Sequence, residues 1–227
     1  MLQSKLSSLA YEQILQNIVS FKLAPGTALQ ERSLAEQMNM SRTPVREALF
    51  RLTHEGWLQN SFRRNVMEVR PVSGRDVEEL LNVRQLLETD GVKRIFENRA
   101  NAPVGEALMD IIAGMRAKRV APGAHAMEYM ALDMKFHTAL MYLDEQSRLG
   151  LFWKPLCLES IRLGIMVIHC HHCEKSMVAD IHEAIARGIL RRRKKEVRDA
   201  LHYHNERIRL QSFRMLEGMA AAGSPGY

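Results

Sequence analysis

The chain has 227 residues, a net charge of +6 at pH 7 and 46% hydrophobic residues, so it is long enough for two compact domains and mildly basic, as many nucleic-acid-binding proteins are. No apolar run approaches the ~20 residues of a transmembrane helix, and the N-terminus lacks the apolar region of a signal peptide, so the composition predicts no membrane partner. The three cysteines are too few for a disulfide framework, which indicates a protein of the reducing cytoplasm.

The first thirty residues predict one helix, a turn and a short strand. Apolar side chains recur at helical spacing over residues 8–21, which predicts a helix with one buried face. The segment Leu-Ala-Pro-Gly at 23–26 ends this helix in a turn. Ala28 and Leu29 can then add a short strand.

The stretch from Gln30 to Leu58, QERSLAEQMNMSRTPVREALFRLTHEGWL, is the feature around which the chain is organised. It reads as two short helices joined by a tight turn, which is the sequence form of a helix-turn-helix. Ser41 occupies the N-cap position of the second helix, where its hydroxyl can accept from free backbone N–H groups. Pro44 falls in the first turn, where its missing N–H costs little. The buried face of this helix is expected to consist of Val45, Ala48, Leu49 and Leu52.

The outer face of this helix pair carries side chains suited to DNA. A helix N-terminus attracts phosphate, an arginine can bind both acceptors of guanine, and threonine can contact a thymine methyl or a phosphate. The candidate DNA-binding residues in this motif are Arg32, Ser41, Arg42, Thr43 and Arg46. The alternative is an amphipathic helix pair with an ordinary charged outer face.

A basic β-hairpin follows the helix pair. Two short strands at Trp57–Leu58 and Val66–Val69 flank a loop whose tip carries Arg63 and Arg64. A helix-turn-helix followed by such a hairpin is a winged helix, and the two arginines would contact flanking phosphates or the minor groove. The first domain is therefore predicted to span residues 1–70 and to bind double-stranded DNA.

The segment PGTALQERSLAEQMNMSRTPVREALFRLTHEGWL resembles the DNA-binding domain of the GntR family of bacterial transcription regulators, over roughly residues 8–70. In that family the positions matching Arg32, Arg42, Thr43 and Arg46 contact operator DNA, and the hairpin tip reaches a base or phosphate. The family usually carries a glycine at that tip, whereas this chain has none between Ser61 and Asn65.

A second, all-helical domain is predicted after a linker at residues 71–76. Helical periodicity runs over residues 76–98, 103–119, 125–143, 146–168, 175–190 and 193–219. About six helices with short connections predict an antiparallel all-α bundle over residues 77–220, followed by a tail at 221–227. The whole chain is thus predicted to be mainly α.

This second half resembles the helical effector-binding (FCD) domain of the FadR-like branch of the GntR family, through the segments NVRQLLETDGVKR, LDMKFHTAL and DIHEAI. The resemblance implies a homodimer that binds a small carboxylic acid. Some members of this branch also bind a divalent metal ion through one aspartate and three histidines.

The helical periodicity itself predicts a metal site inside the bundle. Asp133 and His137 are four residues apart and therefore share one face of a helix, and His182 lies on the buried stripe of another helix. His204 lies on a third buried stripe, whereas His202 should face outward. One carboxylate and three imidazoles suit zinc or nickel with a position open for a ligand. The alternative is that each histidine is a core residue satisfied by a hydrogen bond.

Two arginines are candidates for binding the effector. Proteins similar to this one hold an acidic ligand with an arginine at the position of Arg84, and an arginine can bind a carboxylate through two hydrogen bonds. The alternative for Arg84 is a surface or interdomain salt bridge with Glu88, four residues later. Arg162 is a second candidate for binding the effector. The run from His169 to Cys173 contains CxxC, but five consecutive residues rarely surround one ion, so we interpret it as a connection between helices.

These features predict a ligand-responsive transcription regulator, a repressor that binds a palindromic operator as a homodimer, and not an enzyme. One alternative is a DNA-binding module whose bundle serves only for dimerisation, with a structural metal. The other is a metal-dependent enzyme, since a few histidines and a carboxylate also describe hydrolase and oxygenase sites.

Overall fold

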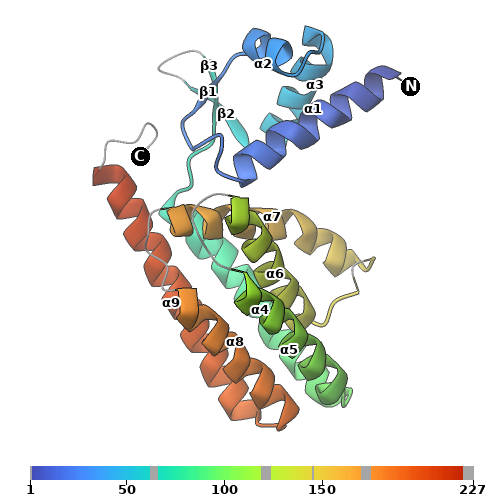
Figure 1. Cartoon of the computed structure of the whole chain (residues 1–227), viewed down its shortest axis with the longest axis vertical. Coiled ribbons are helices and arrows are strands. Elements are labelled where there is room, and N and C mark those ends of the chain that lie inside the picture. The colour runs from blue at the N-terminus through green and yellow to red at the C-terminus, as the bar shows by residue number, and fades with distance from the viewer. Residues whose placement is uncertain (1, 62–65, 119–123, 145, 170–174, 222–227) are drawn as a thin grey trace. The chain divides into compact units, whose positions relative to one another are not determined.

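The computed structural model describes residues 2–61, 66–118, 124–144, 146–169 and 175–221. The chain divides into two compact units, one of residues 1–72 with 219–227 and one of residues 73–218. The described residues form nine helices and three strands, which confirms the prediction of a mainly α chain (Figure 1). None of these helices is long and apolar enough to cross a membrane.

The first unit is a three-helix domain with a small antiparallel sheet. Its elements are α1 (Leu2–Val19), β1 (Ala28–Leu29), α2 (Glu31–Gln37), α3 (Arg42–His54), β2 (Leu58–Ser61) and β3 (Val66–Val69). The sheet order is β1-β3-β2, so the short strand before the helix pair lies beside β3. Helix α1 packs against α3, and α2 packs against α3 as well.

The core of this unit forms where the apolar periodicity places it. Val45, Ala48, Leu49 and Leu52 are all buried on α3, as expected. The chain turns between α2 and α3 with Asn39 in the left-handed region at φ 52°, a conformation that asparagine tolerates better than most residues. One detail of the prediction is wrong, because Ser41 is the N-cap residue of α3 but its hydroxyl makes no capping hydrogen bond.

The second unit is an all-α bundle of six helices. These are α4 (Gly74–Glu97), α5 (Asn101–Ala117), α6 (Ala124–Leu140), α7 (Arg148–His169), α8 (Lys175–Leu190) and α9 (Lys194–Ala221). Helix α5 packs against both α6 and α8, and α6 also packs against α7 (Figure 1). A capping box between Ser73 and Asp76 starts α4 two residues earlier than the periodicity predicts.

The contact between α4 and the end of α6 is close and specific. A Cβ atom on Gly91 of α4 would lie 2.4 Å from the backbone of Met141, just after α6, so only glycine fits there. One turn further along α4, Arg94 donates hydrogen bonds to the carbonyl oxygens of Met141 and Tyr142, at 2.9 and 3.1 Å. These contacts hold the last turns of α6 against α4, and both helices contribute to the site described below.

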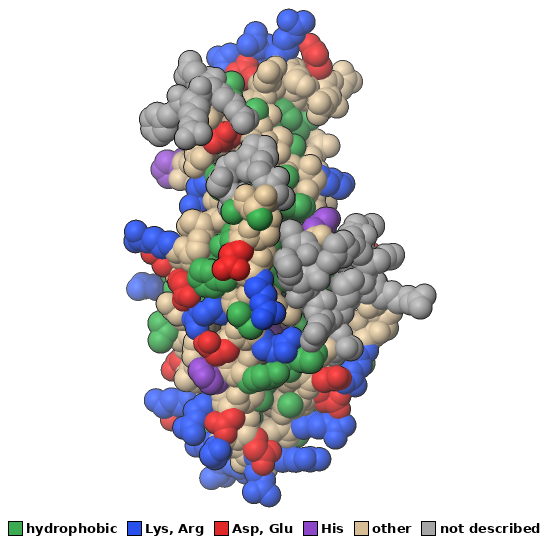
Figure 2. Space-filling view, turned by 90° about the vertical axis from the view of Figure 1, so that its left-hand side faces the viewer, with side chains coloured by type: hydrophobic (Ala, Val, Ile, Leu, Met, Phe, Trp, Pro, Cys, Tyr) green, Lys and Arg blue, Asp and Glu red, His purple; other side chains and the backbone are tan. Residues whose placement is uncertain are grey.

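Basic and acidic side chains are interspersed over the face of the molecule in Figure 2. Many of them form ion pairs between residues four apart on one helix, such as Arg75 with Glu79 and Lys195 with Asp199. Exposed pairs of this kind contribute little to stability. The charged groups that are buried in the second unit are therefore the ones that require an explanation.

Candidate metal centre and nucleic-acid interface

Helix α3 presents its polar face to solvent. Ser41, Arg42, Thr43 and Arg46 are exposed, and so is Arg32 on α2, where it pairs with Glu36 at 2.9 Å. The predicted residues therefore share accessible positions at the start of α3 and on the helix before it. Arg63 and Arg64, predicted at the hairpin tip, lie outside the described residues.

Glu31 organises the two arginines of α3. It lies in the first turn of α2, and its carboxylate accepts a hydrogen bond from Arg42 at 2.9 Å and from Arg46 at 2.9 Å. The hydrogen bond from Arg46 is the first cause that lowers the pKa of Glu31, so the carboxylate stays charged at neutral pH. Both guanidinium groups remain more than half exposed. Glu31 thus aligns two cations on one face of α3, and the sequence offered no signal for this role.

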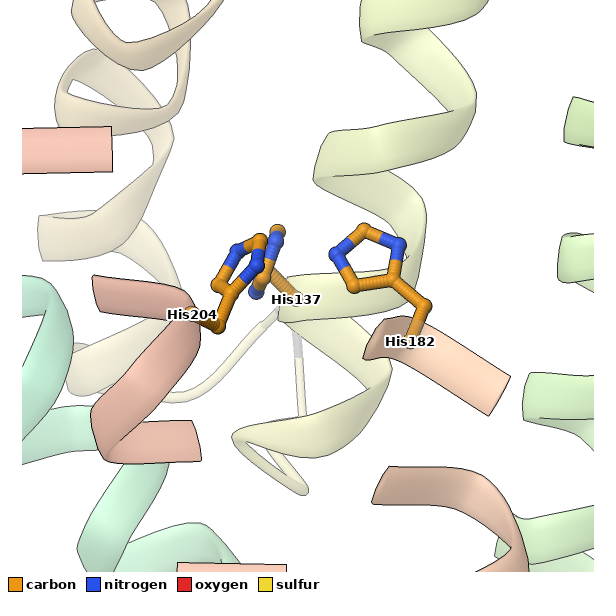
Figure 3. Close-up of side chains that lie close together, drawn as sticks. All are labelled: His137, His182 and His204. Atoms are coloured by element: carbon orange, nitrogen blue, oxygen red, sulfur yellow. The ribbon is translucent and has the colours of Figure 1, made fainter. Parts of the chain in front are cut away.

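The second unit brings three histidines together in its core. His137 of α6, His182 of α8 and His204 of α9 each offer a ring nitrogen, and these nitrogens lie within 4.8 Å of one another. Figure 3 shows the three rings turned toward one another from three separate helices. All three are buried, whereas His202 is exposed, as the periodicity predicts.

Asp133 joins the cluster from one turn before His137 on α6. Its carboxylate oxygens lie 3.7 Å from Nε2 of His137 and 3.7 Å from Nε2 of His182. Burial raises the pKa of Asp133, while the charges of His137 and Arg84 act in the opposite direction. A buried carboxylate beside three imidazoles is the donor set that the sequence predicts for zinc or nickel.

Two charged residues of α4 surround His137. Glu88 Oε1 lies 2.7 Å from Nδ1 of His137 and accepts a second hydrogen bond from Nε of Arg84, at 2.8 Å. Burial raises the pKa of Glu88, but the charges of Arg84 and His137 outweigh it and bring that pKa to about 2. A carboxylate that accepts from Nδ1 holds the imidazole in the form whose Nε2 can bind a metal.

Arg84 lies inside the histidine cluster. Its Nη2 atom is 2.9 Å from Nε2 of His137 and 2.8 Å from Nε2 of His204. Because a guanidinium group can only donate, both Nε2 atoms accept from it and their lone pairs converge on one position. The salt bridge with Glu88 predicted from the sequence forms, but it is buried and not on the surface, and the role of Arg84 in binding an effector stays a prediction.

The protonation states of His182 and His204 and the lack of partners for His182 indicate that the cluster can bind a metal cation. Burial, followed by the neighbouring charges, lowers the pKa of His182 and of His204 well below 6.5. Both rings are therefore neutral at pH 7, which is the form that binds metal. Neither Nδ1 nor Nε2 of His182 has a hydrogen-bond partner among the described residues, and its ring stacks on Phe136 at 4.1 Å. A buried imidazole with no partner is costly unless something binds it, so the residues present fit a metal ion.

A small cavity adjoins the cluster. Its volume is about 60 Å³, and Arg84 and Asp133 line it together with side chains that are mainly aliphatic. Arg162, the second arginine predicted to bind an effector, is buried on α7 but is not among the described residues that line this cavity.

Cys157 is a half-buried free thiol on α7, and burial raises its pKa to about 11, which leaves it unreactive. The run at 169–173 starts at the last residue of α7, but residues 170–173 lie outside the described part of the chain.

Sequence reasoning missed the second contact of Glu88. Its spacing of four from Arg84 indicated the salt bridge, but no local signal indicated that its carboxylate also reaches His137, 49 positions later on another helix.

Comparisons with known proteins agree with this architecture. Residues 6–66 match the family described as bacterial regulatory proteins, gntR family, and residues 79–207 match the FCD domain. The chain is 29% identical over 199 residues to an HTH-type transcriptional regulator in an unstable DNA locus of Streptomyces ambofaciens, covering 84% of this chain and 73% of that protein. It is 25% identical over 222 residues to the gluconate operon transcriptional repressor of Bacillus subtilis, covering 95% and 88%. A solved structure of a GntR transcriptional regulator from Rhodococcus has the same fold, with a TM-score of 0.69 at 20% identity, covering 92% of this chain and 98% of that one.

Proposed function

The chain belongs to the GntR family of bacterial regulatory proteins and carries an FCD domain, and on this premise we propose that it is a metal-dependent, acid-responsive repressor. It binds a palindromic operator as a homodimer through α3, and it releases the operator when a small carboxylic acid binds in the second unit. The family and the relatives are transcription regulators and not enzymes. At least one relative is named as a repressor.

The DNA-binding part of this proposal is supported by the exposed residues of α3. Arg42 and Arg46 are held side by side by Glu31 and remain accessible. A recognition helix inserts its N-terminal residues into the major groove, where arginine binds guanine and threonine contacts thymine. Arg32 and Ser41 would contact the adjoining phosphates. A palindromic operator requires two such helices, which is the reason for proposing a homodimer.

The metal part is supported by one observation above all, three buried imidazoles from three helices whose ring nitrogens lie within 4.8 Å of one another. Asp133, His137, His182 and His204 would hold the ion, with Glu88 fixing the orientation of the His137 ring. When bound, zinc or nickel would supply a positive charge and a coordination position open to a carboxylate oxygen. Arg84 would bind the second oxygen of that carboxylate. Acid binding changes operator binding if the acid binds one arrangement of the DNA-binding and helical units better than another.

The proposal is tested by elemental analysis of the purified, untagged protein and of three variants. We expect about one equivalent of zinc or nickel per chain in the wild type, and its loss in His137→Ala and His204→Ala. His202→Ala is the matched control, because its ring is two residues from His204 but exposed, and it should retain the metal. Metal that is absent from the wild type, or retained in both core variants, would remove the metal site from the proposal.

A second measurement addresses the response to acids. Operator DNA is first selected from a random pool by the protein itself, and release is then measured on addition of a panel of carboxylic acids, with and without a chelator. Release by an acid that chelation abolishes supports the proposal. If chelation lowers only the thermal stability and no acid changes DNA binding, the bundle is a dimerisation device with a structural metal.

A further inference from the structure

The position of Arg84 creates a conflict that the proposed function does not resolve. Its Nη2 atom lies 2.9 and 2.8 Å from the Nε2 atoms of His137 and His204, along the lone pairs that a metal would use. Zinc bound by these two nitrogens would lie about 2.0–2.1 Å from each. The ion and the guanidinium nitrogen would then overlap, and they also repel each other because both are cations.

We propose that Arg84 and the metal ion exclude each other from the position between His137 and His204, so that metal entry transfers the guanidinium to the adjoining cavity, where it anchors an acid with an apolar body. This inference rests on the proposed metal site and deepens it. It adds that the metal must bind before the acid, and that the acid has an apolar body.

The salt bridge with Glu88 makes such a transfer feasible. Glu88 binds Arg84 through Nε, which is not the nitrogen that touches the imidazoles. The guanidinium can therefore turn its outer nitrogens away from the histidines while its charge stays beside Glu88. Arg84 already lines the cavity, together with Asp133 of the metal set, so the new position needs no movement of α4.

The walls of the cavity determine which acid it accepts. Leu80, Leu163 and Val167 are among the aliphatic side chains that line it. A ligand with several hydroxyl groups would leave most of them without hydrogen bonds against such walls, which is costly. The hydroxyl of Ser212 also lines the cavity, is fully buried and has no hydrogen-bond partner among the described residues. Together with Tyr129, Ser160 and Gln211, which also line the cavity, it provides a few polar contacts for a ligand whose body is otherwise apolar.

The exclusion is tested by the zinc affinity of Arg84→Lys, measured by competition with a chromogenic chelator. Lysine keeps the positive charge beside Glu88, but it lacks the outer nitrogen that reaches both imidazoles. We expect zinc binding at least tenfold tighter than in the wild type. If the lysine variant does not fold, Arg84→Met, which also removes the charge, is compared with the wild type in the same way and should likewise bind zinc at least tenfold more tightly. Zinc affinity equal to or weaker than that of the wild type would overturn the exclusion.

The ligand class is tested by calorimetric titration with hexanoate and gluconate, which have the same charge and the same number of carbons. We expect hexanoate to bind the zinc-loaded wild type at least tenfold more tightly than gluconate and more tightly than it binds the zinc-free protein. By linkage, hexanoate must raise the zinc affinity by the same factor. Arg84→Lys should bind hexanoate more weakly although it binds zinc more tightly. Equal binding of the two acids, or equal hexanoate binding with and without zinc, would refute this part.

The outcomes separate this inference from the proposed function. If the wild type binds neither zinc nor nickel, the metal part of the proposed function and this inference both fail. If the wild type binds zinc and releases its operator on addition of an acid, but Arg84→Lys has the zinc affinity of the wild type, only the exclusion fails.

Discussion

The buried ion pair of Glu88 offers a quantitative test of how the second unit is held together. Glu88 is fully buried between Arg84 and His137. The substitution Glu88→Gln keeps the shape of the side chain but removes its charge. Arg84 then loses the only carboxylate among the described residues that accepts a hydrogen bond from it, and breaking a buried pair in this way is strongly destabilising.

The magnitude follows from the pKa of Glu88, which falls from 4.5 to about 2 in the folded protein. Each unit of pKa corresponds to ~1.4 kcal/mol, so the charged form contributes about 3 kcal/mol to the free energy of unfolding at pH 7. Because the folded pKa is the lower one, this contribution is complete above pH 4.5 and is lost as the pH falls toward 2. The expected loss in Glu88→Gln at pH 7 is therefore about 3 kcal/mol.

The assay is urea-induced unfolding of the metal-free protein, followed by circular dichroism at pH 7. The matched control is Glu97→Gln on the same helix, whose carboxylate is half exposed and lies 3.9 Å from Lys93; this change should have little effect. A Glu88→Gln variant as stable as the control at pH 7 would refute the reasoning.

Three further predictions follow from other parts of the molecule. Gly91→Ala should destabilise the second unit by at least about 2 kcal/mol in urea unfolding, because the new Cβ would overlap the backbone that follows α6. Gly114→Ala, whose Cβ would meet only the two methyl groups of Leu132 at 3.6 and 3.8 Å, should be neutral or more stable by up to about 1 kcal/mol. The metal-free protein should lose stability as the pH falls below 6.5, by up to about 1.4 kcal/mol per histidine per pH unit, because His182 and His204 take up protons only on unfolding. Arg42→Ala should weaken operator binding by about 1–3 kcal/mol and relax discrimination against other sequences, as measured by fluorescence anisotropy.

Each of these predictions has an outcome that contradicts it. If Gly91→Ala and Gly114→Ala are equally stable, α4 does not pack closely against the end of α6. Unfolding free energies that are the same at pH 7.5 and 5.5 would mean that the two histidines do not stay neutral in the fold. Equal losses of affinity for operator and random DNA would identify Arg42 as a phosphate contact instead of a base contact.

Local patterns in the sequence were sufficient for the secondary structure and for much of the candidate site. Apolar spacing predicted all six helices of the bundle, because each helix buries one face and its side chains recur every three to four residues. The same periodicity placed His204 inside and His202 outside, as the structure confirms. Asp133 and His137 could be paired because a spacing of four on a helix brings side chains together.

Contacts between helices could not be predicted in this way. Periodicity says that His137, His182 and His204 are each buried, but it does not say that their nitrogens lie within 4.8 Å of one another. The reach of Glu88 to His137 and the position of Arg84 between two imidazoles depend on how α4, α6 and α9 pack. Glu31 reaches Arg42 and Arg46 only because the turn after α2 brings two helices together.

The sequence by itself therefore determined which elements form, which of their faces are buried and which residue types those faces carry, because these properties depend on neighbours within a few positions of the chain. Only the tertiary structure decided which buried groups meet. His137 and His204 both reach the Nη2 atom of Arg84 because the fold brings α6 and α9, from distant parts of the chain, beside this residue of α4. Packing of this kind depends on the shapes of all the side chains between the helices at once, and no local pattern encodes it.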